Sequence, residues 1–142
     1  MQKFITNNAD ETTELGRKLG QSLKGGTVVA FFGGLGMGKT AFTRGLAKAL
    51  CVKEEVSSPT FAIVNDYGGN PPLYHFDMYR VETWDDLYAS GFFGFYEAGG
   101  ILAVEWSENI ENALPENTIR VQIERGEHDN QRIITIDGGV QI

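Results

Sequence analysis

The apolar residues near the start of the chain follow the spacing of an amphipathic helix. Leucine recurs every fourth residue from Leu15 to Leu23, which places these side chains on one helical face. Asn8 and Glu11 precede this stretch and form the pair expected at a helix N-terminus. Two consecutive glycines then end the pattern. We therefore predict a helix that begins after Asn8 and buries its leucine face.

The remaining elements are predicted from short apolar or alternating runs bounded by turn residues. Helices are expected at 39–50 and 83–89, and strands at 27–32, 60–67, 73–76, 101–104, 118–124 and 132–136. The last two strands alternate apolar and polar residues, which favours an antiparallel hairpin. Helices that alternate with fully apolar strands predict an α/β fold with a mainly parallel central sheet flanked by helices.

Composition narrows the class of protein. The 142 residues fit a single domain over 1–142, and 42% hydrophobic residues can fill its core. A net charge of −7 argues against general nucleic-acid binding, which needs a basic surface.

The sequence shows no signal-peptide pattern and no apolar run long enough to span a membrane, so we expect a cytosolic protein with no membrane contact. Cys51, the one cysteine, follows an apolar helical stretch and is expected to be buried.

Residues 33–40 satisfy the pattern G-x-x-x-x-G-K-[ST] between a predicted strand and a predicted helix. Glycines let such a loop turn its N–H groups around phosphate oxygens, and the helix that follows directs its positive end at the same anion. Lys39 is expected to reach the β- and γ-phosphates, and the Thr40 hydroxyl to bind Mg²⁺. The alternative, a glycine-rich turn without a ligand, is disfavoured by the strand and helix on either side. The predicted nucleotide-binding segment comprises Gly34, Leu35, Gly36, Met37, Gly38, Lys39, Thr40 and Ala41.

Two acidic residues end predicted strands. Glu105 follows the apolar run 101–104, and Asp77 follows 73–76. The carboxyl ends of parallel strands face the ligand crevice of an open α/β sheet. Glu105 is therefore predicted to hold Mg²⁺, and Asp77 to orient the attacking water or bind the waters of the metal. The alternatives are an ordinary strand-end acid for Glu105 and a turn-forming aspartate for Asp77.

Other residues near these motifs have two interpretations. His75 is expected to be a hydrogen-bonded core residue rather than a catalytic base. Ser58 or Thr60 would sense the γ-phosphate, unless their segment is only a capping turn that leads into a strand. Trp106 is either a core residue or a contact for a ligand or partner.

Four motifs, in this order along the chain, resemble the TsaE family of small bacterial P-loop ATPases. They are GGLGMGKT at 33–40, SPTF at 58–61, HFDMYR at 75–80 and VEWSE at 104–108. The likeness runs from about residue 12 to residue 108, and the last hairpin fits only in general shape. Gly34 stands where the family usually has an acid, so any role of that acid is lost. Met78 stands where leucine is common, which is an innocuous exchange.

The resemblance implies a fold like that of the P-loop NTPases and a role in forming threonylcarbamoyladenosine in tRNA. The implied cofactors are ATP and Mg²⁺, and the implied partners are TsaB and TsaD, of which TsaD carries the transfer chemistry. ATP binding or hydrolysis would reset or regulate that complex. Contact with tRNA would be indirect, through the partners, in agreement with the acidic charge of this chain.

The resemblance also implies roles for individual residues. Lys39 would act with the loop backbone on the phosphates, Thr40 and Glu105 would hold Mg²⁺, and Asp77 would support hydrolysis. The base or ribose would be bordered by Glu108 and by the segment of residues 9–12, including Thr12.

Three functions remain open: an accessory ATPase, a nucleotide-sensing module with negligible catalysis, and a small-molecule kinase. A kinase commonly has a lid rich in arginine, and the arginines after Glu105 are spread over the predicted hairpin. Arg44 and Arg80 are candidates for neutralising transition-state charge, but neither is marked by its context. We therefore expect slow intrinsic turnover that partners stimulate. The aromatic run 92–96 is either a partner surface or part of the core.

Overall fold

The central feature of the fold is one seven-stranded mixed sheet. The computed structural model describes residues 1–33, 38–53, 55–56, 64–139 and 141–142. In these residues the strand order is β1-β7-β6-β2-β5-β4-β3. The strands are β1 (Gln2–Thr6), β2 (Val28–Phe32), β3 (Val64–Asp66), β4 (Leu73–Asp77), β5 (Ile101–Glu105), β6 (Ile119–Arg125) and β7 (Arg132–Asp137).

The pairing of these strands confirms the predicted fold class. Strand β2 pairs in parallel with β5 and β6, and β5 pairs in parallel with β4. Strands β6 and β7 form the predicted antiparallel hairpin, and β1 and β3 add antiparallel edges. The result is an α/β sheet with a parallel centre and a C-terminal antiparallel hairpin.

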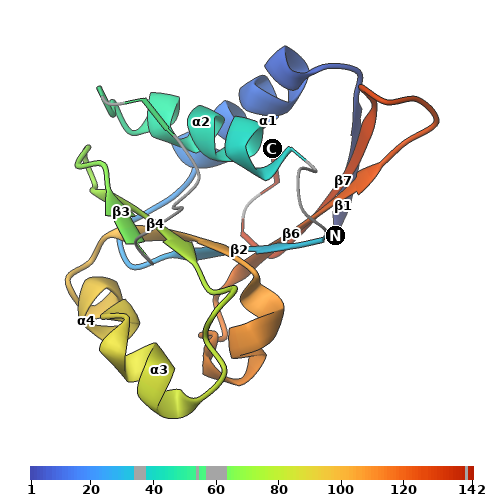
Figure 1. Ribbon diagram of the computed structural model, residues 1–142. Coiled ribbons are helices and arrows are strands. Elements are labelled where there is room, and N and C mark those ends of the chain that lie inside the picture. The colour runs from blue at the N-terminus through green and yellow to red at the C-terminus, as the bar shows by residue number, and fades with distance from the viewer. Residues whose placement is uncertain (34–37, 54, 57–63, 140) are drawn as a thin grey trace.

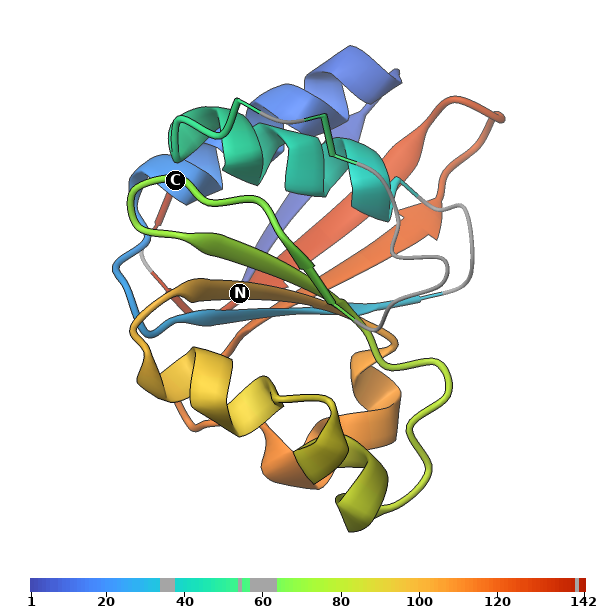
Figure 2. The same cartoon turned by 60° about the vertical axis from the view of Figure 1, so that its left-hand side comes forward.

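Helices cover both faces of the sheet. Helices α1 (Ala9–Gln21) and α2 (Lys39–Ala49) lie on one face, and α3 (Trp84–Ala89), α4 (Phe92–Glu97) and the 3-10 helix η1 (Ser107–Ala113) lie on the other (Figure 1). Figure 2 shows the sheet between these two layers. Each layer buries its own apolar cluster against the sheet, so β2 and β5 are buried on both faces and read as continuous apolar runs.

Local chemistry explains how α1 and α2 form and pack. The side chain of Asn8 accepts a hydrogen bond from the backbone N–H of Glu11 and so caps α1 as predicted. The two helices make their closest approach at Gly16 and Gly45, where an added Cβ would collide with backbone of the opposite helix. Glycine at both positions therefore allows α1 to hold the N-terminal half of α2 against the sheet.

Three elements were not predicted from the sequence. Strand β1 pairs with β7 over residues 2–6, helix α4 covers residues 92–97, and η1 follows β5 directly. The aromatic residues of the run 92–96 belong to the core: Phe92 is buried, and Phe93, Phe95 and Tyr96 pack against the second apolar cluster.

The expectation of a buried Cys51 is wrong. Cys51 is exposed and adopts a left-handed backbone conformation with φ of 60°, directly after the end of α2. The chain turns away from the helix at this residue, and the thiol leaves the apolar face that the preceding residues follow. No helix among the described residues is long and apolar enough to cross a membrane.

Candidate active site at the start of helix α2

The start of α2 is the centre of the candidate site. Strand β2 ends at Phe32, and α2 begins at Lys39 after Gly38, which has a left-handed conformation with φ of 94°. A side chain at Gly38 would be strained in this conformation, and no side chain in the described part of the chain caps the first N–H groups of the helix. These N–H groups and the helix dipole favour an anion at this point. The predicted residues Gly34, Leu35, Gly36 and Met37, and also Ser58 and Thr60, lie outside the described residues.

Lys39 has the environment of a residue that awaits an anionic ligand. Lys39 is only 3% exposed, and its Nζ has no hydrogen-bond partner among the described residues. Nζ lies 5.3 Å from the centre of the Trp106 ring, a cation–π contact. Such a contact replaces only part of the hydration that a buried ammonium loses. A phosphate at the start of α2 would complete the set of partners, so Lys39 fits the predicted nucleotide.

Thr40 and Ala41 follow Lys39 in the first turn of α2. Thr40 is half-buried, whereas Ala41 is buried. Among the described residues, no group of three or more His, Cys, Asp or Glu side chains is placed to hold a metal ion. A divalent cation would therefore depend on a few protein ligands together with phosphate oxygens and water, which is the usual way in which Mg²⁺ binds with a nucleotide.

The two predicted carboxylates lie side by side at the carboxyl ends of neighbouring strands. Asp77 of β4 is the register partner of Glu105 of β5, in a parallel pair. Glu105 is 7% exposed. Asp77 is half-buried, and its Oδ1 accepts a hydrogen bond of 2.9 Å from the backbone N–H of Tyr79. The turn-forming interpretation of Asp77 is therefore observed, and its second carboxylate oxygen is the one left for another role.

The carboxylate of Glu105 is bonded to a buried histidine. His75 Nε2 lies 2.6 Å from Glu105 Oε2, and His75 Nδ1 lies 3.3 Å from the hydroxyl of Tyr67. The prediction that His75 is a hydrogen-bonded core residue agrees with this geometry. Its partner was not predicted, because only the strand register brings residues 30 positions apart into contact.

Trp106 borders the site and also packs against the second apolar cluster. It is half-buried, directly follows Glu105, and has a left-handed backbone conformation with φ of 58°. This conformation is unusual for a bulky residue and often marks a functional site. Of the two interpretations for Trp106, packing against the core is observed, and the contact with Lys39 places the same ring beside the candidate site.

Thr12 lines a small cavity of about 110 Å³ beside the start of α2. Its hydroxyl is buried and bonded to the hydroxyl of Thr6 at 2.7 Å, so its methyl group and backbone form the wall. The cavity joins the end of β1, the N-termini of α1 and α2, and the hairpin β6–β7; its lining residues are Asn8, Ala9, Thr12, Gly38, Ala41, Asn130 and Arg132.

Arg132 is a residue of this cavity that sequence reasoning did not connect with the site. It lies on β7, more than 90 positions after Gly38, and its Nε is buried without a hydrogen-bond partner among the described residues. Its Nη1 donates to the carbonyl oxygens of Asp129 and Gln131, which fixes the guanidinium at the cavity wall. No signal in the sequence separates Arg132 from the other arginines of the hairpin.

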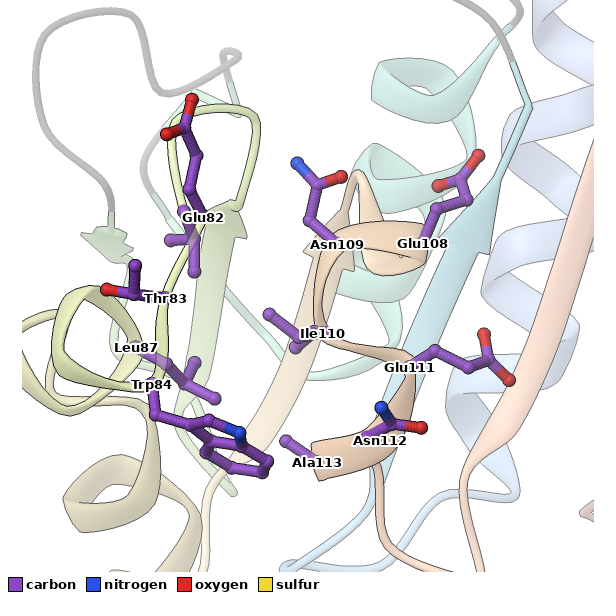
Figure 3. A pocket seen from close by; sticks show the side chains of 11 residues that line it. Glu82, Thr83, Trp84, Leu87, Glu108, Asn109, Ile110, Glu111, Asn112 and Ala113 are labelled. Atoms are coloured by element: carbon purple, nitrogen blue, oxygen red, sulfur yellow. The ribbon is translucent and has the colours of Figure 1, made fainter.

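Glu108 lies in a different place from Thr12. Its Oε2 accepts a hydrogen bond of 3.4 Å from the backbone N–H of Gly33, where β2 ends. Glu108 also lines a cavity of about 220 Å³ between α3 and η1, and in Figure 3 its side chain points away from α3. The two residues predicted to border the base or ribose are therefore found at separate cavities, Thr12 beside α1 and Glu108 beside η1.

The exposed arginines and aromatic residues complete the description of this end of the sheet. Arg44 and Arg80 are both exposed. Trp84 and Tyr88, on α3, are 54% and 65% exposed. These aromatic side chains, and not the run 92–96, are the large apolar groups that α3 and α4 present to solvent.

Comparisons with known proteins agree on one family. The family described as "Threonylcarbamoyl adenosine biosynthesis protein TsaE" matches residues 6–134. The chain is 36% identical over 134 residues to the tRNA threonylcarbamoyladenosine biosynthesis protein TsaE of Treponema pallidum (strain Nichols), covering 94% of this chain and 98% of that protein. It is 37% identical over 132 residues to the protein of the same name from Bacillus subtilis (strain 168), covering 92% and 82%.

A solved structure supports the same relationship at the level of the fold. The crystal structure of YdiB from Bacillus subtilis matches with a TM-score of 0.76 and 32% sequence identity. The match covers 98% of this chain and 86% of that chain. The similarity therefore includes the sheet, both helical layers and the C-terminal hairpin.

Proposed function

Because the chain belongs to the TsaE family, which takes part in threonylcarbamoyladenosine biosynthesis on tRNA, we propose that it is an ATPase that supports this modification. It binds ATP together with Mg²⁺ at the start of α2 and hydrolyses it slowly. It acts in the cytoplasm with TsaB and TsaD and touches tRNA only through that complex. The observation that carries the proposal is the buried Lys39 ammonium without a hydrogen-bond partner among the described residues.

The phosphates are bound by the first turn of α2. Lys39 supplies the positive charge, and the N–H groups from Gly38 onward, together with the backbone of residues 34–37, supply donors. A cation that is already desolvated and already held beside Trp106 loses little further hydration when the anion arrives. Preorganised charge of this kind is what phosphoryl transfer requires of a protein.

Thr40 and Glu105 would hold Mg²⁺. The ion supplies charge neutralisation on the β- and γ-phosphates. The Thr40 hydroxyl lies in the first turn of α2, and the Glu105 carboxylate is fixed by His75 at the end of β5. Asp77, beside Glu105 in the register, has one carboxylate oxygen in its turn and would use the other to orient the attacking water.

The base and ribose are assigned to the cavity that Thr12 and Arg132 line. This cavity is continuous with Gly38 and Ala41, so it lies directly beside the phosphate site. The Nε of Arg132, which has no hydrogen-bond partner in the part of the chain that the structure describes, supplies a donor at its wall. Glu108 stays a candidate for the opposite border of the site through its contact with Gly33.

A nucleotide-sensing module with negligible catalysis is the second candidate function. It is favoured by the hydrogen bond between Asp77 and Tyr79, since a carboxylate engaged in a turn is less free to orient water. Arg44 and Arg80 are exposed, so neither is held in place to neutralise transition-state charge. This is also why we expect TsaB and TsaD to complete the site and accelerate hydrolysis.

The experiment that separates these functions measures phosphate release with the purified chain alone, with TsaB and TsaD, and with all three plus Mg²⁺ chelated by EDTA. An accessory ATPase predicts slow release alone, faster release with the partners and none without Mg²⁺. Equal rates with and without the partners would contradict partner stimulation. Tight binding of ATP with no release under any condition would favour the sensing module.

A further inference from the structure

His75 is the one fully buried imidazole of the chain, and both of its ring nitrogens face polar partners. It lies on β4 beneath α2, on the same face of the sheet as Asp77 and Glu105. Nε2 contacts the Glu105 carboxylate at 2.6 Å, and Nδ1 contacts the Tyr67 hydroxyl at 3.3 Å. His75 is fully buried and Tyr67 belongs to the first apolar cluster, so these polar contacts are shielded from water.

The partner of Nε2 assigns the hydrogen of the imidazole ring, because a carboxylate oxygen accepts the hydrogen bond. The ring hydrogen therefore lies on Nε2, where it is donated to Oε2 of Glu105, and Nδ1 of His75 faces the Tyr67 hydroxyl. Asn65 Nδ2 donates to the Tyr67 hydroxyl oxygen at 3.3 Å. Asn65 and His75 are register partners across β3 and β4. The strand pairing therefore brings Asn65 close to the hydrogen bonds that join Tyr67, His75 and Glu105.

This chain of hydrogen bonds ends at only one carboxylate oxygen of Glu105. Oε2 of Glu105 is held by His75, whereas Oε1 accepts no hydrogen bond from the described residues. A carboxylate fixed by one oxygen has a defined orientation for the other. Glu105 lies at the carboxyl end of β5, directly before Trp106, which contacts Lys39. The free oxygen therefore belongs to the edge of the sheet where the phosphate site lies.

We propose that His75 is a positioning residue for Glu105: by donating from Nε2 it orients the carboxylate that binds Mg²⁺ or its waters, and Tyr67 in turn orients His75. This inference rests on the proposed function, since it assigns a role in binding Mg²⁺ with ATP. Hydrogen-bond partners of metal-binding side chains commonly set metal affinity by about 10–100-fold.

A purely structural role for His75 makes a different prediction. If the imidazole only satisfied its own polar atoms in the core, its loss would lower stability and leave the effect of Mg²⁺ on ATP binding unchanged. The measured quantity is therefore the ratio of ATP affinity with Mg²⁺ to ATP affinity with EDTA, obtained by calorimetry. This ratio cancels any general loss of folded protein or of phosphate contacts.

Three variants test the proposal with this ratio. His75→Leu fills the core without a donor and should lower the ratio about 10-fold or more. His75→Gln keeps an N–H donor near the position of Nε2 and should restore most of the ratio. Leu73→Val, at a fully buried position two residues away on the same face of β4, is the matched control and should leave the ratio unchanged.

A second set of measurements tests the proposal even if His75→Leu does not fold. Tyr67→Phe keeps the ring in the core, removes the hydroxyl that faces His75, and should lower the same ratio by a smaller factor. In wild-type protein, ¹⁵N spectra of the imidazoles should show His75 with its hydrogen on Nε2, and the exposed His128, the only other histidine, provides an internal reference. A ring hydrogen on Nδ1 would overturn the proposal.

The outcomes separate this inference from the proposed function. If wild-type protein binds ATP more tightly with Mg²⁺ and His75→Leu or Tyr67→Phe shows the same ratio, the positioning role fails and the proposed function stands. If His75→Gln behaves like His75→Leu, the donor is not what matters and the positioning role fails as well. If wild-type protein shows no effect of Mg²⁺ on ATP binding, both fail.

Discussion

The ammonium nitrogen of Lys39 lies 5.3 Å from the centre of the Trp106 ring, at the junction of α2 with the end of β5. This contact links α2, the helix proposed to bind the phosphates, to the strand that carries Glu105. An anion at the start of α2 would compete with the ring for the ammonium, because a charge-assisted hydrogen bond is stronger than a cation–π contact. The indole of Trp106 should therefore report on the occupancy of the site.

Trp106 fluorescence is expected to change when ATP and Mg²⁺ are added. The chain has two tryptophans, and Trp84 is 54% exposed on α3, outside the site. Trp84→Phe isolates the emission of Trp106 and should retain the full change in emission on titration. Trp106→Phe serves as the matched control and should show none. A change that follows Trp84 instead would place the nucleotide away from α2.

Lys39→Met is expected to stabilise the ligand-free protein while it removes nucleotide binding. A buried ammonium without a hydrogen-bond partner among the described residues costs more than the roughly 1–3 kcal/mol of a neutral polar group, and methionine fills a similar volume without charge. We expect the free energy of unfolding in urea to rise by roughly 1 kcal/mol. Lys48→Met, at an exposed position of the same helix, should change it by less than about 0.5 kcal/mol. A clear loss of stability in Lys39→Met would mean that the ammonium has partners.

Asp77→Asn distinguishes the structural role of Asp77 in its turn from its proposed role in ATP hydrolysis. The asparagine side chain can still accept the hydrogen bond from the Tyr79 N–H, whereas its negative charge is lost. If Asp77 orients the attacking water, Asp77→Asn should lower the rate of ATP hydrolysis about 100-fold and leave ATP affinity unchanged. Asp77→Ala should match it in rate and also lose stability. Wild-type turnover in Asp77→Asn would reduce Asp77 to a turn residue.

The contact between α1 and α2 is expected to tolerate no added methyl group. Gly45→Ala would place a Cβ against the backbone of Thr13 and Arg17, and should lower the free energy of unfolding by about 3 kcal/mol or more. Gly94→Ala is the matched helical control: among the described residues, no atom beyond its chain neighbours and the backbone of its own helix lies within 4 Å of the added Cβ. It should raise stability by about 0.5–1 kcal/mol, because alanine favours the helix. Thermal or urea unfolding of both variants checks the sign of each effect.

Much of the fold follows from local signals in the sequence. The cap at Asn8 and the leucine spacing after it predict α1, and the apolar runs predict the central parallel strands, because strands buried on both faces need no polar positions. Strand β1 was missed since its alternating edge pattern is short and gains its stability from β7, which lies at the other end of the chain. Helix α4 was missed because its aromatic residues and Gly94 are weak helix formers. The helix is instead stabilised by the burial of Phe92.

Some residues of the candidate site could be predicted from the sequence, and others could not. Lys39, Glu105 and Asp77 could be chosen because each stands at a defined end of an element, where the chemistry of phosphate and metal binding places such residues. The contacts of His75 and Arg132 could not be predicted, because strand register and hairpin packing bring them to the site from distant positions. Exposure of Cys51 was missed for a local reason, a positive φ at a residue other than glycine.

In the proposed function, the buried Lys39 ammonium binds the phosphates of ATP together with Mg²⁺. The decisive measurement is isothermal titration calorimetry of wild-type protein and Lys39→Ala with ATP in the presence of Mg²⁺. We expect saturable binding at one site per chain in the wild type, and no detectable heat of binding in Lys39→Ala, whose fold is checked by circular dichroism. Equal binding by both proteins, or no binding by the wild type, would contradict the claim.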